Sequence, residues 1–287
     1  MQSSALGSLA KEALLYEVSV TPKPGLVDRA GSGAHMDMDY GTFTASAEAL
    51  EPYFAACAAA GSAFEGADPA QLFPQLRELG KQAEAAMYRA TGGVNTHKGA
   101  VFTLGLLCAA AGLLAKEAPG RNAEAPRPVS GEDICLLAGN ICRDVAADYT
   151  FSDKCPSTAG EKLHAAEGVG GIRAEAANGF PALRELALPL LRNDPERDSD
   201  PNLTGVRILL QLICRVEDTT LMKRSGLRDL TPLHLEAEAV LTSPDLLSAA
   251  AALDRSWSAR GLSAGGCADL LSAAYFLYSA EKSFFSR

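Results

Sequence analysis

The sequence has 287 residues, of which 47% are apolar, 21% charged and 6% aromatic. This composition excludes an intrinsically disordered chain, which needs low hydrophobicity and high net charge. It also disfavours an all-β sandwich, because alanine is abundant whereas β-branched and aromatic residues are few. The formal net charge of −9 argues against a general nucleic-acid binder, since such proteins carry an excess of basic residues.

The cysteines and the apolar segments indicate where the protein resides. The seven cysteines form no CxxC pair, and most stand in apolar helical stretches, which is typical of reduced, buried thiols in a cytoplasmic protein. Residues 1–10 lack the basic and apolar regions of a signal peptide. The uncharged run at residues 99–115 falls short of the ~20 residues that a membrane span needs. We therefore expect a buried central helix there, a cytoplasmic location and no membrane partner.

Helical periodicity dominates the chain, and no segment shows the strict alternation of apolar and polar residues that is typical of a strand. Thr42 and Ser130 are placed to cap the helices that follow them, and Pro244 after Ser243 is typical of a helix start. We therefore predict an all-α protein with a single multi-helix domain over residues 1–287 and an active site built from inter-helix loops. The expected helices cover residues 4–20, 42–60, 71–90, 98–116, 131–149, 161–177, 182–192, 202–217, 233–241, 244–259 and 266–283.

Two segments are predicted to be surface connections. Residues 118–130 contain three prolines, which forbid a continuous helix, and residues 193–202 combine two prolines with several aspartates. Other connections combine glycine with charged, amide or imidazole groups. Functional residues concentrate on loops that a rigid scaffold positions, so these connections are the expected place of the active site.

The first such connection carries a lysine, a histidine and several aspartates. Prolines on both sides of Lys23 favour an extended backbone there, which would present Lys23 and then Asp28. His35, Asp37 and Asp39 follow at alternating positions, so in an extended chain they would share one face, within reach of a hard cation or a hydroxyl. The alternative is a solvated polar loop.

The second connection, residues 91–99, leads directly into the uncharged run. It lacks the spacing of a Walker A loop, but its two glycines, a helix start and the Lys98 charge are suited to an anion. Asn95 and His97 add hydrogen-bonding groups. The alternative is an ordinary helix start in which Thr96 is the cap and the histidine faces the core.

The third and fourth connections pair carboxylates with guanidinium groups. Arg173 has the fork-shaped donor geometry that suits phosphate, and Glu175 follows it as a candidate ligand for a metal or a ribose hydroxyl. Asp218 and Arg224 stand in a run of two carboxylates followed by two cations. Structural ion pairs on a helix face are the alternative for both segments.

The fifth connection opens the last predicted helix. Gly265 and Gly266 make a backbone-lined anion site feasible, and Asp269 stands in the first helical turn. The alternative is that Asp269 only complements the helix dipole. Cys267 has no base beside it in the sequence and is interpreted as a small packing residue.

Six motifs occur in a fixed order over nearly the whole chain: PKPGLVD (22–28), GAHMDM (33–38), TGGVNTHKGAVF (91–102), RAEAANGFP (173–181), the Asp218 segment and GGCADLL (265–271). Together they resemble the triphosphoribosyl-dephospho-CoA synthase family, which makes the prosthetic-group precursor for acyl carrier subunits of citrate lyase or malonate decarboxylase. The resemblance implies an all-α pentosyltransferase. Such an enzyme moves the triphosphoribosyl group of ATP to the ribose 2′-hydroxyl of 3′-dephospho-CoA and releases adenine.

The sequence departs from the family pattern at four positions. Thr220 replaces an asparagine, Ala174 a glycine, Ala264 a proline and Cys267 a serine. These changes affect expected substrate contacts, whereas the charged residues of the same motifs are retained.

The implied reaction sets the expected roles. Glycosyl transfer develops positive charge on the ribose ring as the base departs, so the site has to hold the triphosphate, activate the acceptor hydroxyl and help adenine leave. We expect Mg²⁺ as the cofactor, bridging phosphate oxygens to carboxylates. The expected metal ligands are Asp37, Glu175 and Asp218. The expected substrate-binding residues are Lys23, Asn95, His97, Lys98, Arg173, Arg224, Gly265 and Gly266. The catalytic candidates are Asp28, Asp37 or Asp269 as the general base, and His35 or His97 to protonate adenine or bind a phosphate.

The expected partners are ATP and 3′-dephospho-CoA, with the product passed to a holo-acyl carrier protein transferase; a homo-oligomer is compatible with the sequence. One alternative is an all-α, Mg²⁺-dependent hydrolase of ADP-ribose-like glycosides, in which water is the acceptor. Another is a non-catalytic helical scaffold. The sequence leaves the choice between the citrate lyase and malonate decarboxylase pathways open.

Overall fold

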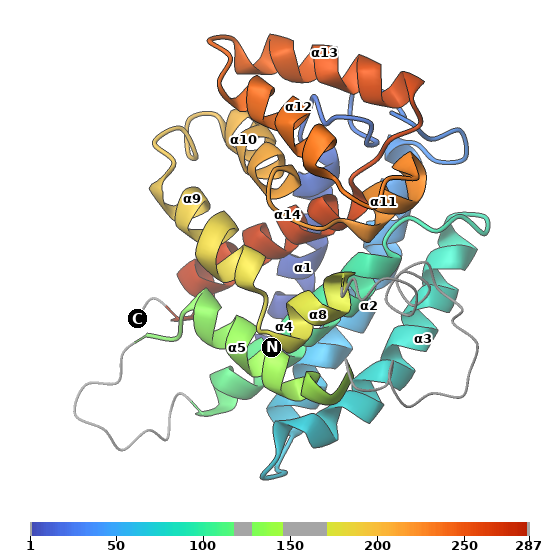
Figure 1. Ribbon diagram of the computed structural model, residues 1–287. Helices are drawn as coiled ribbons and strands as arrows, with labels where there is room; N and C mark the ends of the chain where they lie inside the picture. Colours follow the sequence, from blue (N-terminus) through green and yellow to red (C-terminus); the bar gives the residue numbers. More distant parts are fainter. Residues whose placement is uncertain (1, 118–127, 146–170, 286–287) are drawn as a thin grey trace.

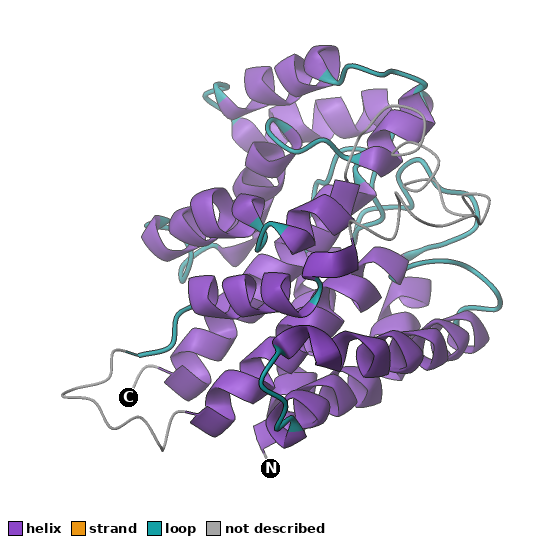
Figure 2. Ribbon diagram, turned by 60° about the horizontal axis from the view of Figure 1, so that its bottom comes forward, coloured by secondary structure: helices purple, strands orange, loops and turns teal. Residues whose placement is uncertain are grey.

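The computed structural model describes residues 2–117, 128–145 and 171–285. In these residues every regular element is a helix and no strand occurs, as Figure 2 shows, which confirms the all-α prediction. Buried apolar side chains from the first helix to the last turn form one cluster, so these helices share a hydrophobic core.

Figure 1 shows the elements in their order along the chain. They are α1 (Gln2–Ser19), α2 (Tyr40–Ala63), the 3₁₀ turn η1 (Pro69–Leu72), α3 (Phe73–Ala90), α4 (Lys98–Glu117), α5 (Gly131–Ile141), the 3₁₀ turn η3 (Arg143–Val145), α8 (Gly171–Ala177), the π-turn η4 (Ala182–Ala187), α9 (Leu188–Asn193), α10 (Pro201–Ile213), α11 (Thr219–Ser225), α12 (Thr231–Leu241), α13 (Leu246–Ala259), α14 (Gly265–Ala280) and the π-turn η5 (Glu281–Phe285).

Helices α4 and α14 form the centre of the molecule. Helix α4 packs against α1, α2, α3, α5 and α14, and α14 also contacts α9, α10 and α11. Residues 98–116 are long and apolar enough to cross a membrane, but 78% of that window is buried inside the fold. The prediction of a buried central helix is therefore confirmed, because its apolar faces are covered by neighbouring helices.

Helix starts agree with the predictions only in part. Ser130 caps α5, as predicted. Helix α2 begins earlier than predicted, because Asp39 rather than Thr42 is its cap: the Asp39 carboxylate accepts the Thr42 N–H at 2.8 Å. Helix α13 begins later, because Asp245 rather than Ser243 is its cap: the Asp245 carboxylate accepts the Ser248 N–H at 3.1 Å.

One short helix was absent from the predicted elements. The helix expected over 202–217 ends at Ile213, and after a short turn the chain forms α11. Asp218 caps this helix and Gly226, with a φ of 69°, ends it. The helix predicted over 131–149 already ends at Ile141. Residues 118–127 and 161–170, which carried a predicted loop and the first part of a predicted helix, lie outside the described residues.

The four helix starts of α4, α8, α11 and α14 meet in space although they are distant in the sequence. Residues of all four starts line one cavity, which also takes in the turns around residues 178–181 and 215–217. The helical body thus gathers four of the five connections that the sequence singled out at a single place, whereas the first, with Lys23 and Asp37, does not line the cavity.

Candidate active site

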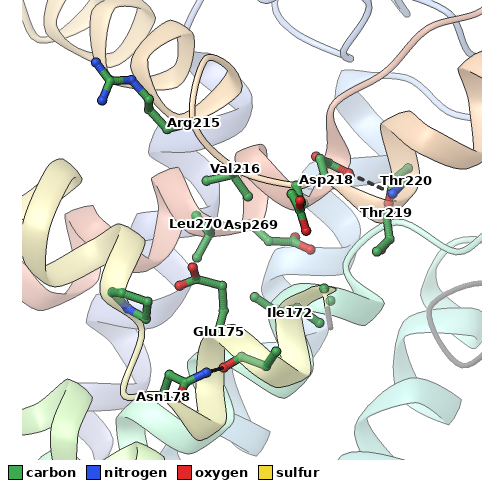
Figure 3. Close-up of a pocket in the computed structure, with 16 residues that line it drawn as sticks. Ile172, Glu175, Asn178, Arg215, Val216, Asp218, Thr219, Thr220, Asp269 and Leu270 are labelled. Carbon is green, nitrogen blue, oxygen red and sulfur yellow. Dashed lines mark hydrogen bonds between the residues drawn. The ribbon is translucent and has the colours of Figure 1, made fainter. Parts of the chain in front are cut away.

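The cavity at the four helix starts has a volume of about 350 Å³. Gly99, Gly171, Thr219 and Gly266 mark the starts of α4, α8, α11 and α14 around it. Figure 3 shows side chains of α8, α11 and α14 pointing into this shared space.

The cavity is lined mainly by acidic charge. Glu175, Glu217, Asp218 and Asp269 all line it, whereas Arg215 is the one basic residue among the described lining residues. In Figure 3 the Arg215 guanidinium points away from the Glu175 and Asp269 carboxylates. Glu175, Asp218 and Asp269 belong to none of the ion pairs within the described residues. A polyanion entering this space therefore needs a cation to offset the repulsion.

The Asp218 carboxylate forms hydrogen bonds with the starts of two helices. Its Oδ1 accepts the backbone N–H groups of Thr220 and Leu221 at 2.8 and 3.0 Å, and its Oδ2 accepts the N–H of Cys267 at 2.9 Å. The carboxylate thus caps α11 and binds the first turn of α14 at once. Burial raises its pKa in spite of these hydrogen bonds, because the charged form is poorly solvated there.

Asp269 lies just after the first turn of α14, and its side chain reaches the start of α4. Its carboxylate lies against Gly99, and the backbone N–H of Ala100 favours its charged form. Burial, followed by the negative charges of Glu17 and Asp218, nevertheless raises its pKa well above the usual range. A carboxylate with a raised pKa at the edge of a cavity is suited to accepting a proton.

Glu175 of α8 faces the same space from the opposite side (Figure 3). Its Oε2 accepts the backbone N–H of Ala182 at 3.2 Å, which fixes the direction of the side chain. Burial raises the pKa of this carboxyl group too. Of the predicted metal ligands, Glu175 and Asp218 are therefore brought to one cavity.

The structure places Lys23 and Asp28 in the interior instead of presenting them to a ligand. The Lys23 side chain is 1% exposed and forms an ion pair with Glu17 of α1, which is also buried. Asp28 accepts the backbone N–H groups of Lys23, Ala30 and Gly31, so it stabilises a turn. Neither residue lines the cavity. The proline-containing segment is therefore buried rather than presented to a ligand. Its burial is possible because Lys23 pairs with Glu17 and Asp28 accepts backbone N–H groups.

The segment before α4 also has a different role from the one predicted. His97 is buried, its Nδ1 lies 2.7 Å from the Ser46 hydroxyl, and burial, followed by the Lys23 charge, lowers its pKa to about 3. It is therefore the core-facing, neutral histidine of the alternative interpretation. Asn95 accepts the N–H of Lys98 at 3.3 Å, and the Lys98 ammonium pairs with Glu84 at 2.9 Å. None of these predicted ligands lines the cavity; their neighbour Gly99 does.

His35 and Arg224 contact each other rather than the cavity. His35 Nδ1 lies 3.0 Å from the Arg224 guanidinium, and its Nε2 lies 3.0 Å from the Ser263 hydroxyl. Asp37 is exposed and is not brought to Glu175 and Asp218. The predicted common face of His35, Asp37 and Asp39 is wrong, because this loop folds into turns and Asp39 caps α2.

The remaining predicted residues lie at or beside the cavity. Gly266 lines it, and Gly265 packs near Thr220. Arg173 stands on α8 between Ile172 and Ala174, which line the cavity, but it is not itself a lining residue.

Several residues that line the cavity were not predicted from the sequence. Asn178 follows Glu175 at the end of α8, and Thr219 follows the Asp218 cap. Both residues belong to motifs that were already identified in the sequence, and this position could have marked them as candidates. Among the described residues no three His, Cys, Asp or Glu side chains converge as a preformed metal site.

Comparison with known proteins identifies the family of the chain. The family model described as ATP:dephospho-CoA triphosphoribosyl transferase matches residues 3–286. The chain is 38% identical to the 2-(5''-triphosphoribosyl)-3'-dephosphocoenzyme-A synthase of Pectobacterium atrosepticum, over 93% of this chain and 86% of that protein. It is 40% identical to a probable synthase of the same name from Pectobacterium carotovorum, with the same coverage, and 38% identical to one from Streptococcus mutans, over 94% of both chains. No solved structure matches. The chain therefore belongs to the ATP:dephospho-CoA triphosphoribosyl transferase family.

Proposed function

We propose that the cavity at the starts of α4, α8, α11 and α14 is the place where this chain transfers the triphosphoribosyl group. The chain is a transferase of its family, and the reaction joins ATP and 3′-dephospho-CoA with release of adenine. The main support for this location is that three acidic residues of separate motifs, Glu175, Asp218 and Asp269, line the same cavity.

The reaction forms one bond and breaks another at the anomeric carbon of ATP. The 2′-hydroxyl oxygen of dephospho-CoA bonds to C1′, and the bond from C1′ to the adenine nitrogen breaks with its electron pair going to adenine. The hydroxyl proton goes to a base, and one proton is delivered to the departing adenine, so that neutral adenine leaves. Asp269 is the residue we assign as that base, because it lines the cavity and its pKa is raised. Asp28 and Asp37 do not reach the cavity. The nearby carboxylates also favour the positive charge that develops on the ribose ring.

The donor set of the cavity fits a magnesium ion that arrives with the nucleotide. Mg²⁺ in nucleotide sites takes one or two carboxylates, and phosphates and waters complete its coordination, so a preformed three-ligand site is not needed. Glu175 and Asp218 are the carboxylates that would hold it. Asp218 accepts three backbone N–H groups and also hydrogen-bonds to the Cys267 thiol. A metal ion would therefore take the acceptor position that the weakly bound thiol holds. The ion would offset the negative charge of the triphosphate against that of the cavity.

Transfer is favoured over the hydrolysis of ADP-ribose-like glycosides by the family match over residues 3–286 and by the named relatives. ATP and dephospho-CoA are the substrates that the family name implies. Delivery of the product to a holo-acyl carrier protein transferase, homo-oligomer formation and a cytoplasmic location stay predictions.

Adenine release from ATP tests the function and the metal together. We expect release to depend on dephospho-CoA, to stop in excess EDTA and to return when Mg²⁺ is added. Glu175→Gln should lower kcat/KM at least about tenfold and raise the Mg²⁺ concentration needed for half-maximal rate, since it removes a ligand charge.

Glu238→Gln is the matched control, because Glu238 is an exposed carboxylate on α12 outside the cavity. It should leave both quantities unchanged. Adenine release without dephospho-CoA would support the hydrolase, and full activity in EDTA would refute the magnesium assignment.

A further inference from the structure

The carboxylate of Asp269 occupies the space of a side chain that Gly99 does not have. A Cβ atom at Gly99 would lie 1.9 Å from Oδ2 of Asp269 and 3.1 Å from its Cγ. The first distance is incompatible with the present position of the carboxylate, because non-bonded atoms do not approach to 1.9 Å, and the second is a tight contact. The need for glycine here is a need for space, since Gly99 lies in the first turn of α4 with helical geometry.

Because Gly99 has no side chain, the Asp269 carboxylate can approach the start of α4. The backbone N–H of Ala100 and the positive end of the α4 dipole, a helix of 20 residues, both favour a negative charge there. Burial and the charges of Glu17 and Asp218 act in the opposite direction. The approach to α4 thus stabilises the charged form of Asp269 against these effects.

The helix that carries Asp269 cannot easily move to relieve a clash. The first turn of α14 is bound through the N–H of Cys267 to Asp218, at 2.9 Å. A Cβ at Gly266 would lie 3.1 Å from the Asp218 carboxylate, so this contact is also close-packed. Asp218 in turn caps α11. A side chain at position 99 would therefore displace the Asp269 carboxylate itself rather than shift α14.

We propose that Gly99 is a positioning residue for the transfer reaction: by leaving space at the start of α4, it holds the Asp269 carboxylate in the orientation in which it faces the cavity. This inference rests on the proposed function, in which Asp269 is the base. Gly99 touches neither substrate nor the reacting atoms in this role; it acts through Asp269.

The test compares Gly99→Ala with Gly105→Ala on the same helix. A Cβ at Gly105 would lie 2.1 Å from the Tyr53 hydroxyl, so that variant also meets a close contact, but Gly105 does not line the cavity. We expect Gly99→Ala to lower kcat about 100-fold, the typical effect of a displacement near 1 Å, with little change in KM for ATP. Gly105→Ala should lower the melting temperature and leave kcat near that of the wild type.

Asp269→Asn distinguishes the role of Asp269 as the base from the positioning role of Gly99. It should lower kcat by about 10²–10⁴, and full activity in this variant would refute the proposed base. If Asp269→Asn is inactive while Gly99→Ala keeps the wild-type kcat, or if both glycine variants lose kcat equally, the positioning role is refuted and the cavity assignment stands.

A double variant keeps the test valid if Gly99→Ala does not fold. Asp269→Ala removes the carboxylate that the new Cβ would meet, so Gly99→Ala in that background should fold and add no further loss of activity. A combined variant that still fails to fold, or that loses activity additively, would contradict a role exercised through Asp269.

Discussion

The charge state of Asp269 depends on what surrounds a single carboxyl group. Burial is the largest cause of its raised pKa, and the negative charge of Glu17 on α1 is the second. Glu17 itself pairs with Lys23. The Ala100 N–H acts in the opposite sense. A general base has to be deprotonated, so a raised pKa moves the acid limb of activity to higher pH.

Glu17→Gln should therefore move the acid limb of kcat/KM to lower pH. The substitution removes a negative neighbour and leaves the Lys23 ammonium, and both changes favour the charged form of Asp269. In the wild type the limb should lie above the pH range of an ordinary carboxyl group. The measurement is kcat/KM for dephospho-CoA as a function of pH, with exposed Glu12→Gln on the same helix as the control. An unshifted limb in Glu17→Gln would contradict Asp269 as the titrating base.

At the scale of elements, Arg192 joins three helical segments that are far apart in the sequence. It binds both oxygens of Glu132 on α5, at 2.5 and 2.8 Å, and also pairs with Glu281 at the start of η5. Glu281 in turn accepts the N–H of Gly131 at the start of α5. The hydrogen bonds from Arg192 hold the pKa of Glu132 at about 2, below its ordinary value of 4.5.

This lowered pKa predicts a pH-dependent contribution to stability. Because the folded-state pKa of Glu132 lies below the unfolded value, the stabilisation is present above about pH 4.5 and is lost as the pH falls through about 2. Glu132→Gln should lower the free energy of unfolding by about 1 kcal/mol at neutral pH, a modest figure because the pair is partly solvated. Urea denaturation of both proteins should show the difference shrinking between pH 4.5 and 2. A difference that is the same at all pH values would contradict the ionic origin.

At the scale of the whole molecule, α4 is the helix on which the others converge. Its side chains after the first turn are almost all buried, and α1, α2, α3, α5 and α14 surround it. Its first turn is also a wall of the cavity. The same helix thus supports the core along its length and the site at its start.

Truncation of a core side chain on α4 should show this central position. Leu107 is fully buried, so Leu107→Ala should lower the free energy of unfolding by about 2–5 kcal/mol through lost transfer energy and the cavity left behind. Leu235→Ala on α12 is the control, since Leu235 is 58% exposed and should change stability by less than about 0.5 kcal/mol. Thermal or urea unfolding measures both. Equal losses in the two variants would contradict the core position of α4.

Much of the fold could be predicted because helical periodicity and end signals are local. The uncharged run of α4, the Ser130 cap and the absence of strands in the described residues follow from residues close together in the chain. The short helix α11 was not predicted, because seven residues are too few to show helical periodicity, although Asp218 and Gly226 mark its ends.

The sequence by itself determined the helical class, the family motifs and the acidic residues Glu175, Asp218 and Asp269. Only the tertiary structure decided which candidate charges face the cavity. It buried Lys23 against Glu17 and left Asp37 exposed, and it placed Asp269 against Gly99. The physical reason is that the exposure and partners of a charge depend on how distant helices pack, and no pattern of neighbouring residues encodes the contact between the starts of α4 and α14.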